Sequence, residues 1–251
     1  MRTLMSERFA PITSSLGFVK APLDAVAAEA ANWTAGLQPN TRATEVRGSL
    51  PELLTRLGPL VTSIRPRMLY VGAGGGAWTA YFDCLSSGSD PVGPVDVLAQ
   101  RLGCDGVRVT TVPDEYGPDA AGRYGRQGAV SFTLVRAARP ADKAAATVRS
   151  VSVMRENERF LFEEHGEAQP FEQTERYASR RIRDRLTSEM VEAYCRALGL
   201  EPFEAASYGP RAVLVDCEAR WDAKGGPGYF PLAEVQARRG IVPGAADTAR
   251  G

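Results

Sequence analysis

The sequence predicts a single α+β domain in which antiparallel hairpins pack against helices. Three observations lead to this prediction. Short runs rich in Val, Thr and aromatic residues are bounded by Gly, Pro and Asp, as is typical of strands. Two such runs, 147–154 and 159–164, are separated by only four residues, which suits a hairpin turn. The helical segments do not alternate regularly with the strands, as a doubly wound parallel sheet would require.

Helices are identified from apolar residues at helical spacing and from the residue types at their ends. We expect helices, in chain order, at 22–35, from 51 onward, at 95–102, at 173–200 and at 231–239. Ser49 stands where the second helix needs a cap, and Gly103 stands where the third must stop. Thr187 or Ser188 interrupts the fourth helix and caps its second half.

Strands are identified from short runs of β-branched and aromatic residues, several of them alternating with polar ones. We expect extended segments, in chain order, at 41–50, 67–71, 107–112, 129–136, 147–154, 159–164 and 211–217. Residues 113–128 are rich in Gly, Pro, Asp and Tyr, so we expect a loop there.

The composition is that of an ordinary globular protein. The 251 residues include 30 Lys and Arg against 30 Asp and Glu, so the formal net charge is zero. A general nucleic-acid binder needs surplus basic residues to displace phosphate counterions, so the charge balance argues against that class. No apolar run approaches the roughly 20 residues that cross a bilayer, and residues 1–10 do not read as a signal peptide. We therefore expect a cytoplasmic protein with no membrane partner.

We expect three parts along the chain. Residues 1–19 lack clear periodicity and are expected to form a flexible N-terminal arm. Residues 20–221 hold most of the predicted helices and strands and form the single α+β domain. Residues 222–251 are rich in Gly and Pro and are expected to form a C-terminal tail that holds one short helix.

Two stretches share the order hairpin, polar turn, and helix ending in Leu-Gly. The first spans residues 68–103 and the second spans residues 150–199. This order suggests two related hairpin-plus-helix units. A Leu-Gly ending is common because glycine tolerates the left-handed cap, so a chance similarity stays open as the alternative.

The sharpest enzyme hypothesis comes from a glycine-rich run. An apolar strand followed by Gly72, Gly74 and Gly76 resembles the first motif of class I S-adenosylmethionine-dependent methyltransferases, whose glycines let the main chain approach the cofactor. The resemblance implies that these three glycines bind that cofactor. Three features disagree with it. Tyr70 stands where the family places an acidic residue, and prolines break residues 86–96, where a second strand is needed. The chain beyond does not alternate helix and strand as that fold requires.

The other interpretation of the same run is a hairpin turn. Trp78, Ala80 and Phe82 alternate with Thr79 and Tyr81, and these aromatic and β-branched residues favour strands. The glycines would then form a flexible turn between two antiparallel strands. We favour this interpretation, and with it a protein that needs no cofactor.

The single histidine and the scattered cysteines limit the available chemistry. His165 is the only histidine, so multi-histidine metal sites are excluded, and we expect it to be exposed at a strand end. The four cysteines show no Cys-x-x-Cys spacing, and we expect reduced, buried thiols at Cys84, Cys104, Cys195 and Cys217. We expect no metal site and no catalytic residue.

Two charge clusters follow one another late in the chain. The acidic cluster, expected to be a solvated turn, consists of Glu163, Glu164, Glu167, Glu172 and Glu175. The basic cluster, expected on an exposed helix face, consists of Arg176, Arg180, Arg181, Arg183 and Arg185. Glu172 and Arg176 would form a favourable i,i+4 pair on that helix. An anion or RNA site on the arginines is the alternative.

Several short motifs occur along the chain, and they are WTAYFD at 78–83, GSDP at 88–91, QPFE at 169–172, RRIRDR at 180–185 and YCRALG at 194–199. With these motifs, residues 20–210 resemble a family of uncharacterised actinobacterial proteins. The resemblance implies a bacterial cytosolic protein and supplies no activity or catalytic residue. By general layout only, such small α+β proteins are similar to immunity proteins that neutralise bacterial toxins.

These observations lead to two functional hypotheses. The first is a non-catalytic protein-binding module, of immunity type, with a protein partner of unknown identity. Aromatic residues and arginine are frequent interface anchors, so the expected partner surface consists of Trp78, Tyr81, Asp83, Tyr177 and Arg181. The second is a methyltransferase-like enzyme that uses the glycine-rich run.

Overall fold

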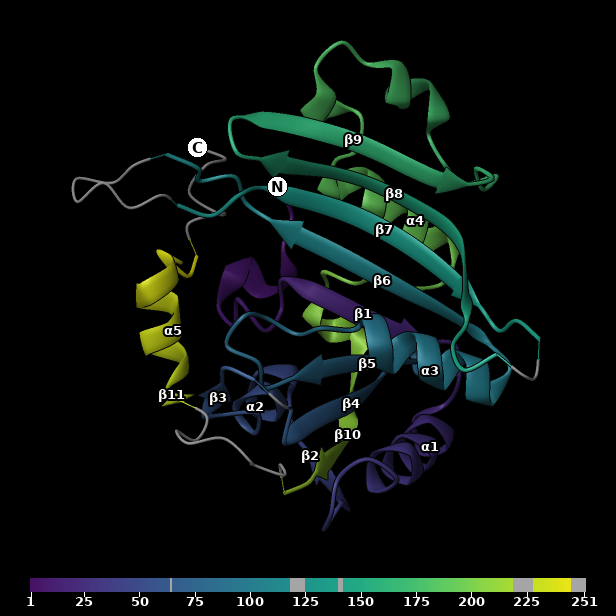
Figure 1. Cartoon of the computed structure of the whole chain (residues 1–251), viewed down its shortest axis with the longest axis vertical. Helices are drawn as coiled ribbons and strands as arrows, with labels where there is room; N and C mark the ends of the chain where they lie inside the picture. The colour runs from purple at the N-terminus through teal and green to yellow at the C-terminus, as the bar shows by residue number, and fades with distance from the viewer. Residues whose placement is uncertain (64, 118–124, 140–141, 219–227, 245–251) are drawn as a thin grey trace.

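The computed structural model describes residues 1–63, 65–117, 125–139, 142–218 and 228–244. Its centre is one nine-stranded antiparallel sheet with the strand order β2-β10-β4-β5-β1-β6-β7-β8-β9 (Figure 1). The strands are β1 (Ser15–Val19), β2 (Arg42–Arg47), β4 (Arg67–Ala73), β5 (Trp78–Asp83), β6 (Asp105–Val112), β7 (Ala129–Arg136), β8 (Ala146–Glu156), β9 (Arg159–Gly166) and β10 (Tyr208–Asp216). A separate two-stranded sheet pairs β3 (Leu60–Val61) with β11 (Tyr229–Phe230).

In the described ranges, five α-helices and five 3-10 turns accompany the sheets. The helices are α1 (Leu23–Ala35), α2 (Leu50–Thr55), α3 (Val92–Leu102), α4 (Ser188–Ala197) and α5 (Leu232–Arg239). The 3-10 turns are η1 (Leu4–Glu7), η2 (Gly74–Gly76), η3 (Thr174–Ala178), η4 (Ile182–Asp184) and η5 (Ala205–Ser207). The predicted α+β class with antiparallel hairpins is confirmed. No helix in the part of the chain that the structure describes is long and apolar enough to cross a membrane.

The predicted helix ends are confirmed by their capping contacts. Ser49 and Glu52 form a reciprocal capping box at the start of α2. Gly103 adopts the left-handed conformation after α3. The side chain of Thr187 accepts a hydrogen bond from the main-chain N–H of Met190 at the start of α4. These ends form as predicted because each depends on residues that are close in sequence.

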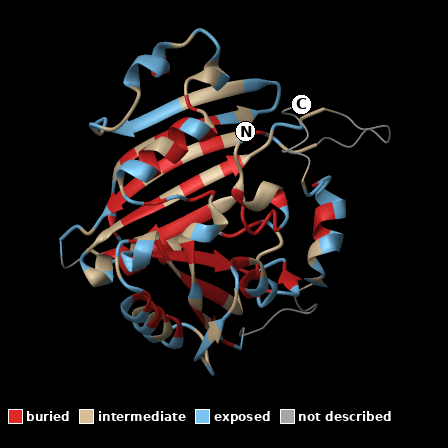
Figure 2. Ribbon diagram, turned by 180° about the vertical axis from the view of Figure 1, so that it is seen from behind, coloured by how far each residue is buried: buried red, intermediate tan, exposed pale blue. Residues whose placement is uncertain are grey.

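The sheet has a buried layer on each face. Side chains alternate between the faces, so Tyr70 and Tyr81 pack with α1 and α3 on one side. Phe82 and Phe132 point to the other side, into a larger core that also contains Tyr194 of α4 and residues of α2. Figure 2 shows that the central strands are buried, whereas the chain beside β9 is largely exposed.

The prediction of a flexible N-terminal arm at residues 1–19 is wrong. β1 is the central strand of the sheet, between β5 and β6, and the preceding Phe9 and Ile12 are buried. Gly17 allows α3 to approach β1, because a Cβ there would lie 2.6 Å from side-chain atoms of Pro91 and Val95. The strand was missed because its pairing partners lie far away in the sequence.

The predicted C-terminal tail is partly packed against the domain. β11 and the predicted short helix α5 are present, and the side-chain amide of Gln236 donates to the carbonyl oxygens of Arg8 and Ala10. The tail residues 222–227 and 245–251 lie outside the described residues. The described part of the tail therefore continues the domain.

The two hairpin-plus-helix units differ in their plan. Both hairpins form, as β4–β5 and β8–β9. However, α3 packs on the face opposite to α4. The strand after α3 lies beside β1, whereas the strand after α4 crosses to the far end of the sheet, between β2 and β4. The shared order of elements therefore corresponds to two different connections.

Candidate functional site

The glycine-rich run forms the turn of a hairpin. β4 and β5 are antiparallel, with Ala73 opposite Trp78, so the four residues between them make the turn. Gly75 and Gly76 have φ values of 66° and 93°, which L side chains rarely adopt. Residues 78–83 form a strand, as the hairpin interpretation predicts. The strand-to-helix turn of the methyltransferase motif is not formed here.

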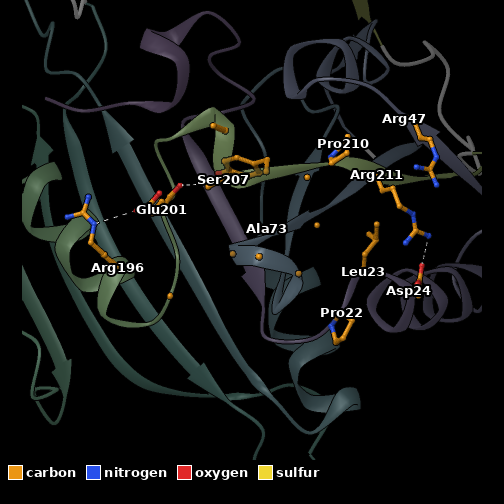
Figure 3. Close-up of a pocket in the computed structure, with 18 residues that line it drawn as sticks. Pro22, Leu23, Asp24, Arg47, Ala73, Arg196, Glu201, Ser207, Pro210 and Arg211 are labelled. Carbon is orange, nitrogen blue, oxygen red and sulfur yellow. Dashed lines mark hydrogen bonds and ion pairs between the residues drawn. The ribbon is translucent and has the colours of Figure 1, made fainter.

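This glycine turn lines a groove of about 900 Å³ at one end of the sheet (Figure 3). It is lined by the N-terminus of α1, the ends of β2 and β4, the glycine turn, the C-terminus of α4 with the loop that follows it, η5 and the start of β10. Its lining residues are Pro22, Leu23, Asp24, Arg47, Gly72, Ala73, Gly74, Gly75, Gly76, Arg196, Gly199, Glu201, Ala206, Ser207, Tyr208, Gly209, Pro210 and Arg211. We call it the glycine groove.

A break in strand pairing opens the floor of the glycine groove. The register between β10 and β4 shifts from Tyr208–Ala73 to Ala212–Val71, so residues 209–211 bulge opposite Gly72. Gly72 itself has an ordinary strand backbone, and a Cβ at this position would meet no atom within 4 Å. Neither conformation nor packing inside the chain therefore requires glycine, although glycine weakens a strand. The open space lets another molecule approach the main chain closely.

Ion pairs flank the glycine turn on both sides (Figure 3). The bulge directs Arg211 towards Asp24 and Glu45, each 3.0 Å from its guanidinium. The hydrogen bond from Arg211 lowers the pKa of Glu45 below its ordinary value. On the opposite side, Arg196 pairs with Glu201 at 3.8 Å. Each of these arginines already has an acidic partner, so the charges of the groove are balanced.

The polar side chains of the groove are occupied by main-chain partners. The hydroxyl of Ser207 donates to the carbonyl oxygens of Glu201 and Glu204 at 2.8 Å each. The hydroxyl of Tyr208 donates to the carbonyl oxygen of Pro202 at 2.7 Å. Among the described lining residues there is no histidine or cysteine that could act as a base or nucleophile. The serine and tyrosine hydroxyls of the groove are therefore engaged within the chain.

The histidine and the four cysteines lie outside the glycine groove. His165 is exposed near the end of β9, opposite Ser150, as its sequence position predicts. All four cysteines are free thiols, of which Cys104 is only partly buried. Within the described ranges, no three His, Cys, Asp or Glu side chains are grouped closely enough to hold a metal ion.

Three residues of the expected partner surface are buried in the central hairpin. Trp78, Tyr81 and Asp83 are at most 2% exposed. The indole of Trp78 donates to the carbonyl oxygen of Leu198, and the hydroxyl of Tyr81 donates to Asp83. The expectation that they anchor a partner is corrected, because β5 is covered on both faces.

The remaining two residues lie between β9 and α4. Tyr177 is buried, whereas Arg181 is exposed on the surface. The predicted helix over 173–200 forms only in its second half, from Ser188. Glu172 does not pair with Arg176 in a solvated turn; its side chain is fully buried against Arg149. That contact spans 23 residues of sequence rather than one helical turn.

The β10 bulge and Arg211 were not anticipated from the sequence. The one available signal is the Gly209-Pro210 pair before a buried strand, because proline cannot donate to a ladder and is confined to edges and bulges. Comparisons of the chain with protein-family models, with curated proteins and with solved structures find no match. Function is therefore argued from the geometry of the described residues.

Proposed function

We propose that the chain is a non-catalytic protein-binding module that accepts an extended segment of a partner protein in the glycine groove. The observation that carries this proposal is Gly72, where the strand lacks a side chain although nothing inside the chain requires it. Close approach of a second main chain would use that space. Extended peptides bind through main-chain hydrogen bonds, with pockets for alternate side chains, and the break in pairing leaves Gly72 without a register partner on β10.

The chemistry of the groove supports a peptide ligand over a strongly charged one. Arg47, Arg196 and Arg211 each have an acidic partner within 4 Å. A ligand with high net charge would have to break these pairs. A peptide main chain offers hydrogen-bond donors and acceptors without net charge, so it could bind without breaking these pairs.

Peptide display tests the proposal. A random peptide library would be selected on the wild-type chain and counter-selected on Gly72→Leu, which fills the space above β4. We expect enriched peptides that bind the wild type in calorimetry and bind Gly72→Leu about tenfold more weakly or worse, because lost burial and steric overlap reduce affinity.

The matched control is Gly93→Leu in α3. A Cβ at Gly93 also meets no atom within 4 Å, but this residue does not line the groove. Gly93→Leu should bind the selected peptides as the wild type does. Failure to enrich any peptide, or equal binding by Gly72→Leu, would show that the groove does not receive a peptide.

A narrower form of the proposal is an immunity-type protein that neutralises a bacterial toxin in the cytoplasm. Free rather than disulfide-bonded cysteines are consistent with a reducing compartment. Co-expression with a toxin encoded beside this chain would test it. Growth rescue by the wild type that is lost in Gly72→Leu would support the narrower form, and the absence of rescue would exclude it for that toxin.

The methyltransferase-like alternative keeps one observation in its favour, because Gly72, Gly74 and Gly76 do line the groove. The hairpin lacks the helix N-terminus that receives a nucleotide-like ligand after such a loop. We expect no heat of binding when millimolar S-adenosylmethionine is titrated into the chain. A saturable heat that is lost in Gly72→Leu would instead favour the enzyme.

A further inference from the structure

The segment 167–187, which we call the arginine arm, joins β9 to α4 over the exposed end of the sheet (Figure 1). Its only regular structure is the pair of 3-10 turns η3 and η4. Loops longer than about 12–15 residues without secondary structure of their own are uncommon in compact domains and are usually functional or disordered. The contacts of this arm show that it is ordered.

A buried network holds the start of the arginine arm. The guanidinium of Arg149 donates from Nε and Nη2 to both carboxylate oxygens of Glu172, and their side chains are 2% and 0% exposed. Glu172 also accepts from the hydroxyl of Tyr177 at 2.7 Å. Tyr194 of α4 adds its hydroxyl, which accepts from the main-chain N–H of Gln173. The arm is therefore tied to both β8 and α4.

The arginines of the arm divide into two groups. Arg185 is structural, since its Nε donates to the carbonyl oxygen of Ser179 and its guanidinium lies over the ring of Phe162. The exposed group, which we call the arginine patch, consists of Arg176, Arg180, Arg181 and Arg183. In this patch only Arg181 has an ion-pair partner among the described residues, Asp184 at 3.7 Å.

We propose that the arginine patch docks an acidic surface of the partner protein. This proposal rests on the protein-binding function proposed above and adds the chemistry of the partner. Planar guanidinium groups pair with carboxylates in a bidentate manner, and the patch contains no lysine. The exposed acids of the arm, Glu167 and Glu175, precede the run from Arg180 to Arg183, which leaves that run basic.

A carboxylate surface fits the molecule better than a nucleic acid. The formal net charge of the chain is zero, so there is no surplus of positive charge to steer a long polyanion. The arginine patch is small and lies on an ordered segment, so it is complementary to a small cluster of Asp and Glu on the partner. Exposed charges at the periphery of an interface mainly affect the association rate and its dependence on salt.

Fluorescence anisotropy with a labelled Asp-Gly repeat peptide tests the patch. We expect salt-sensitive binding to the full-length wild type that weakens at least about tenfold in the triple variant Arg176→Gln, Arg180→Gln, Arg183→Gln. The control variant Arg42→Gln, Arg56→Gln, Arg139→Gln removes the same charge from other exposed sites. It should change the affinity by no more than about twofold.

Three results would overturn the proposal. The first is no binding above that of an Asn-Gly repeat peptide. The second is an equal loss in both triple variants, which would indicate net charge alone. The third is tighter binding of a single-stranded RNA of equal charge, which would indicate a nucleic-acid site. Gly72→Leu should retain the acidic peptide, so failure of the groove and failure of the patch are distinguishable.

Discussion

Asp83 and Glu172 both have side chains with no exposed surface, and they are stabilised in different ways. Asp83 lies at the end of β5 in the centre of the sheet. Its oxygens accept hydrogen bonds of 2.9 Å from the hydroxyl of Tyr81 and from the main-chain N–H groups of Leu85 and Asp90. The nearest cation, Arg65, is 3.8 Å away and partly exposed. Neutral donors from neighbouring residues therefore carry most of the stabilisation of this site.

Glu172, in the arginine arm, is held mainly by a charge. Arg149 reaches it from β8 with two donor nitrogens, Nε and Nη2, at 2.8–3.1 Å, and Tyr177 adds a hydroxyl. Arg149 also donates to Glu164 at 2.7 Å, so one guanidinium joins β8, β9 and the arm. The site is assembled from residues that are distant in the sequence.

The pKa values of the two carboxyl groups record this difference. Burial raises the pKa of Asp83 above 3.8, and its hydrogen bonds only partly offset the effect. Burial also acts on Glu172, but the hydrogen bond from Arg149 and those from Gln169 and Tyr177 outweigh it, so the pKa is lowered below 4.5. Neutral donors thus dominate around the carboxylate of the central hairpin, whereas a cation dominates around the carboxylate of the arginine arm.

The largest expected effect is the loss of that charged partner. Arg149→Met leaves Glu172 buried without a counter-ion, and we expect a loss of about 3–5 kcal/mol in the free energy of unfolding. Arg65→Met is the matched change at the other carboxylate, and we expect about 1 kcal/mol or less because Arg65 is more distant and partly exposed. Urea unfolding of both variants measures the contrast. Equal losses would mean that the two carboxylates are stabilised alike.

The next effect is a pair of opposite pH dependences. The lowered pKa of Glu172 contributes stability above pH 4.5 that is lost as the pH falls through the folded-state value. The raised pKa of Asp83 contributes stability that is complete below pH 3.8 and is lost as the pH rises through the folded-state value. Glu172→Gln should therefore cost most at neutral pH, about 1.5–3 kcal/mol for its charge-assisted bonds. Asp83→Asn should cost most in acid.

Urea unfolding between about pH 3.5 and pH 7.5 checks these signs, because the range covers the ordinary carboxyl pKa values. The free-energy difference between wild type and Glu172→Gln should grow as the pH rises. The difference between wild type and Asp83→Asn should shrink over the same range. Two slopes of the same sign would contradict the assignment of the two sites.

The same contrast explains how much of the fold could be predicted from the sequence. The start of α2, the end of α3 and the start of α4 could be predicted because Ser49, Gly103 and Thr187 act on residues within a few positions. The hairpins could be predicted because their paired strands are close in sequence. The place of β1 in the centre of the sheet was not predicted, since its pairing with β5 and β6 is a long-range choice. Local patterns also could not show that β5 would be covered on both faces.

The candidate sites follow the same rule. The glycine turn was identified from sequence, but the groove also needs the β10 bulge, whose Gly72 partner lies well over a hundred residues earlier. The partner of Glu172 was predicted to be Arg176, four residues away, because helical spacing was assumed. In the structure its partner is Arg149, 23 residues away, which β8 places against the arm.

The smallest expected effect is a local one, in which a single substitution loosens the arginine arm and leaves the sheet unchanged. Tyr177→Phe keeps the ring beside Phe162 but removes the hydroxyl that donates to Glu172 and lies 3.0 Å from that of Tyr194. We expect a loss of about 1 kcal/mol, because one hydrogen bond is removed while Arg149 remains in place. Hydrogen exchange should rise in the arm and stay unchanged in the central strands.

Tyr208→Phe is the control, since it removes a comparable bond, to the carbonyl oxygen of Pro202, far from the arm in the sequence. It should leave exchange in the arm as in the wild type. If Tyr177→Phe left the arm unchanged, the hydroxyl would not hold it, and the arginine patch would depend on Arg149 and Glu172 alone. If exchange also rose equally in β4 and β5, the arm and the central hairpin would open together as one cooperative unit. The two buried carboxylates would then differ in their local hydrogen bonds but would not mark regions that open independently.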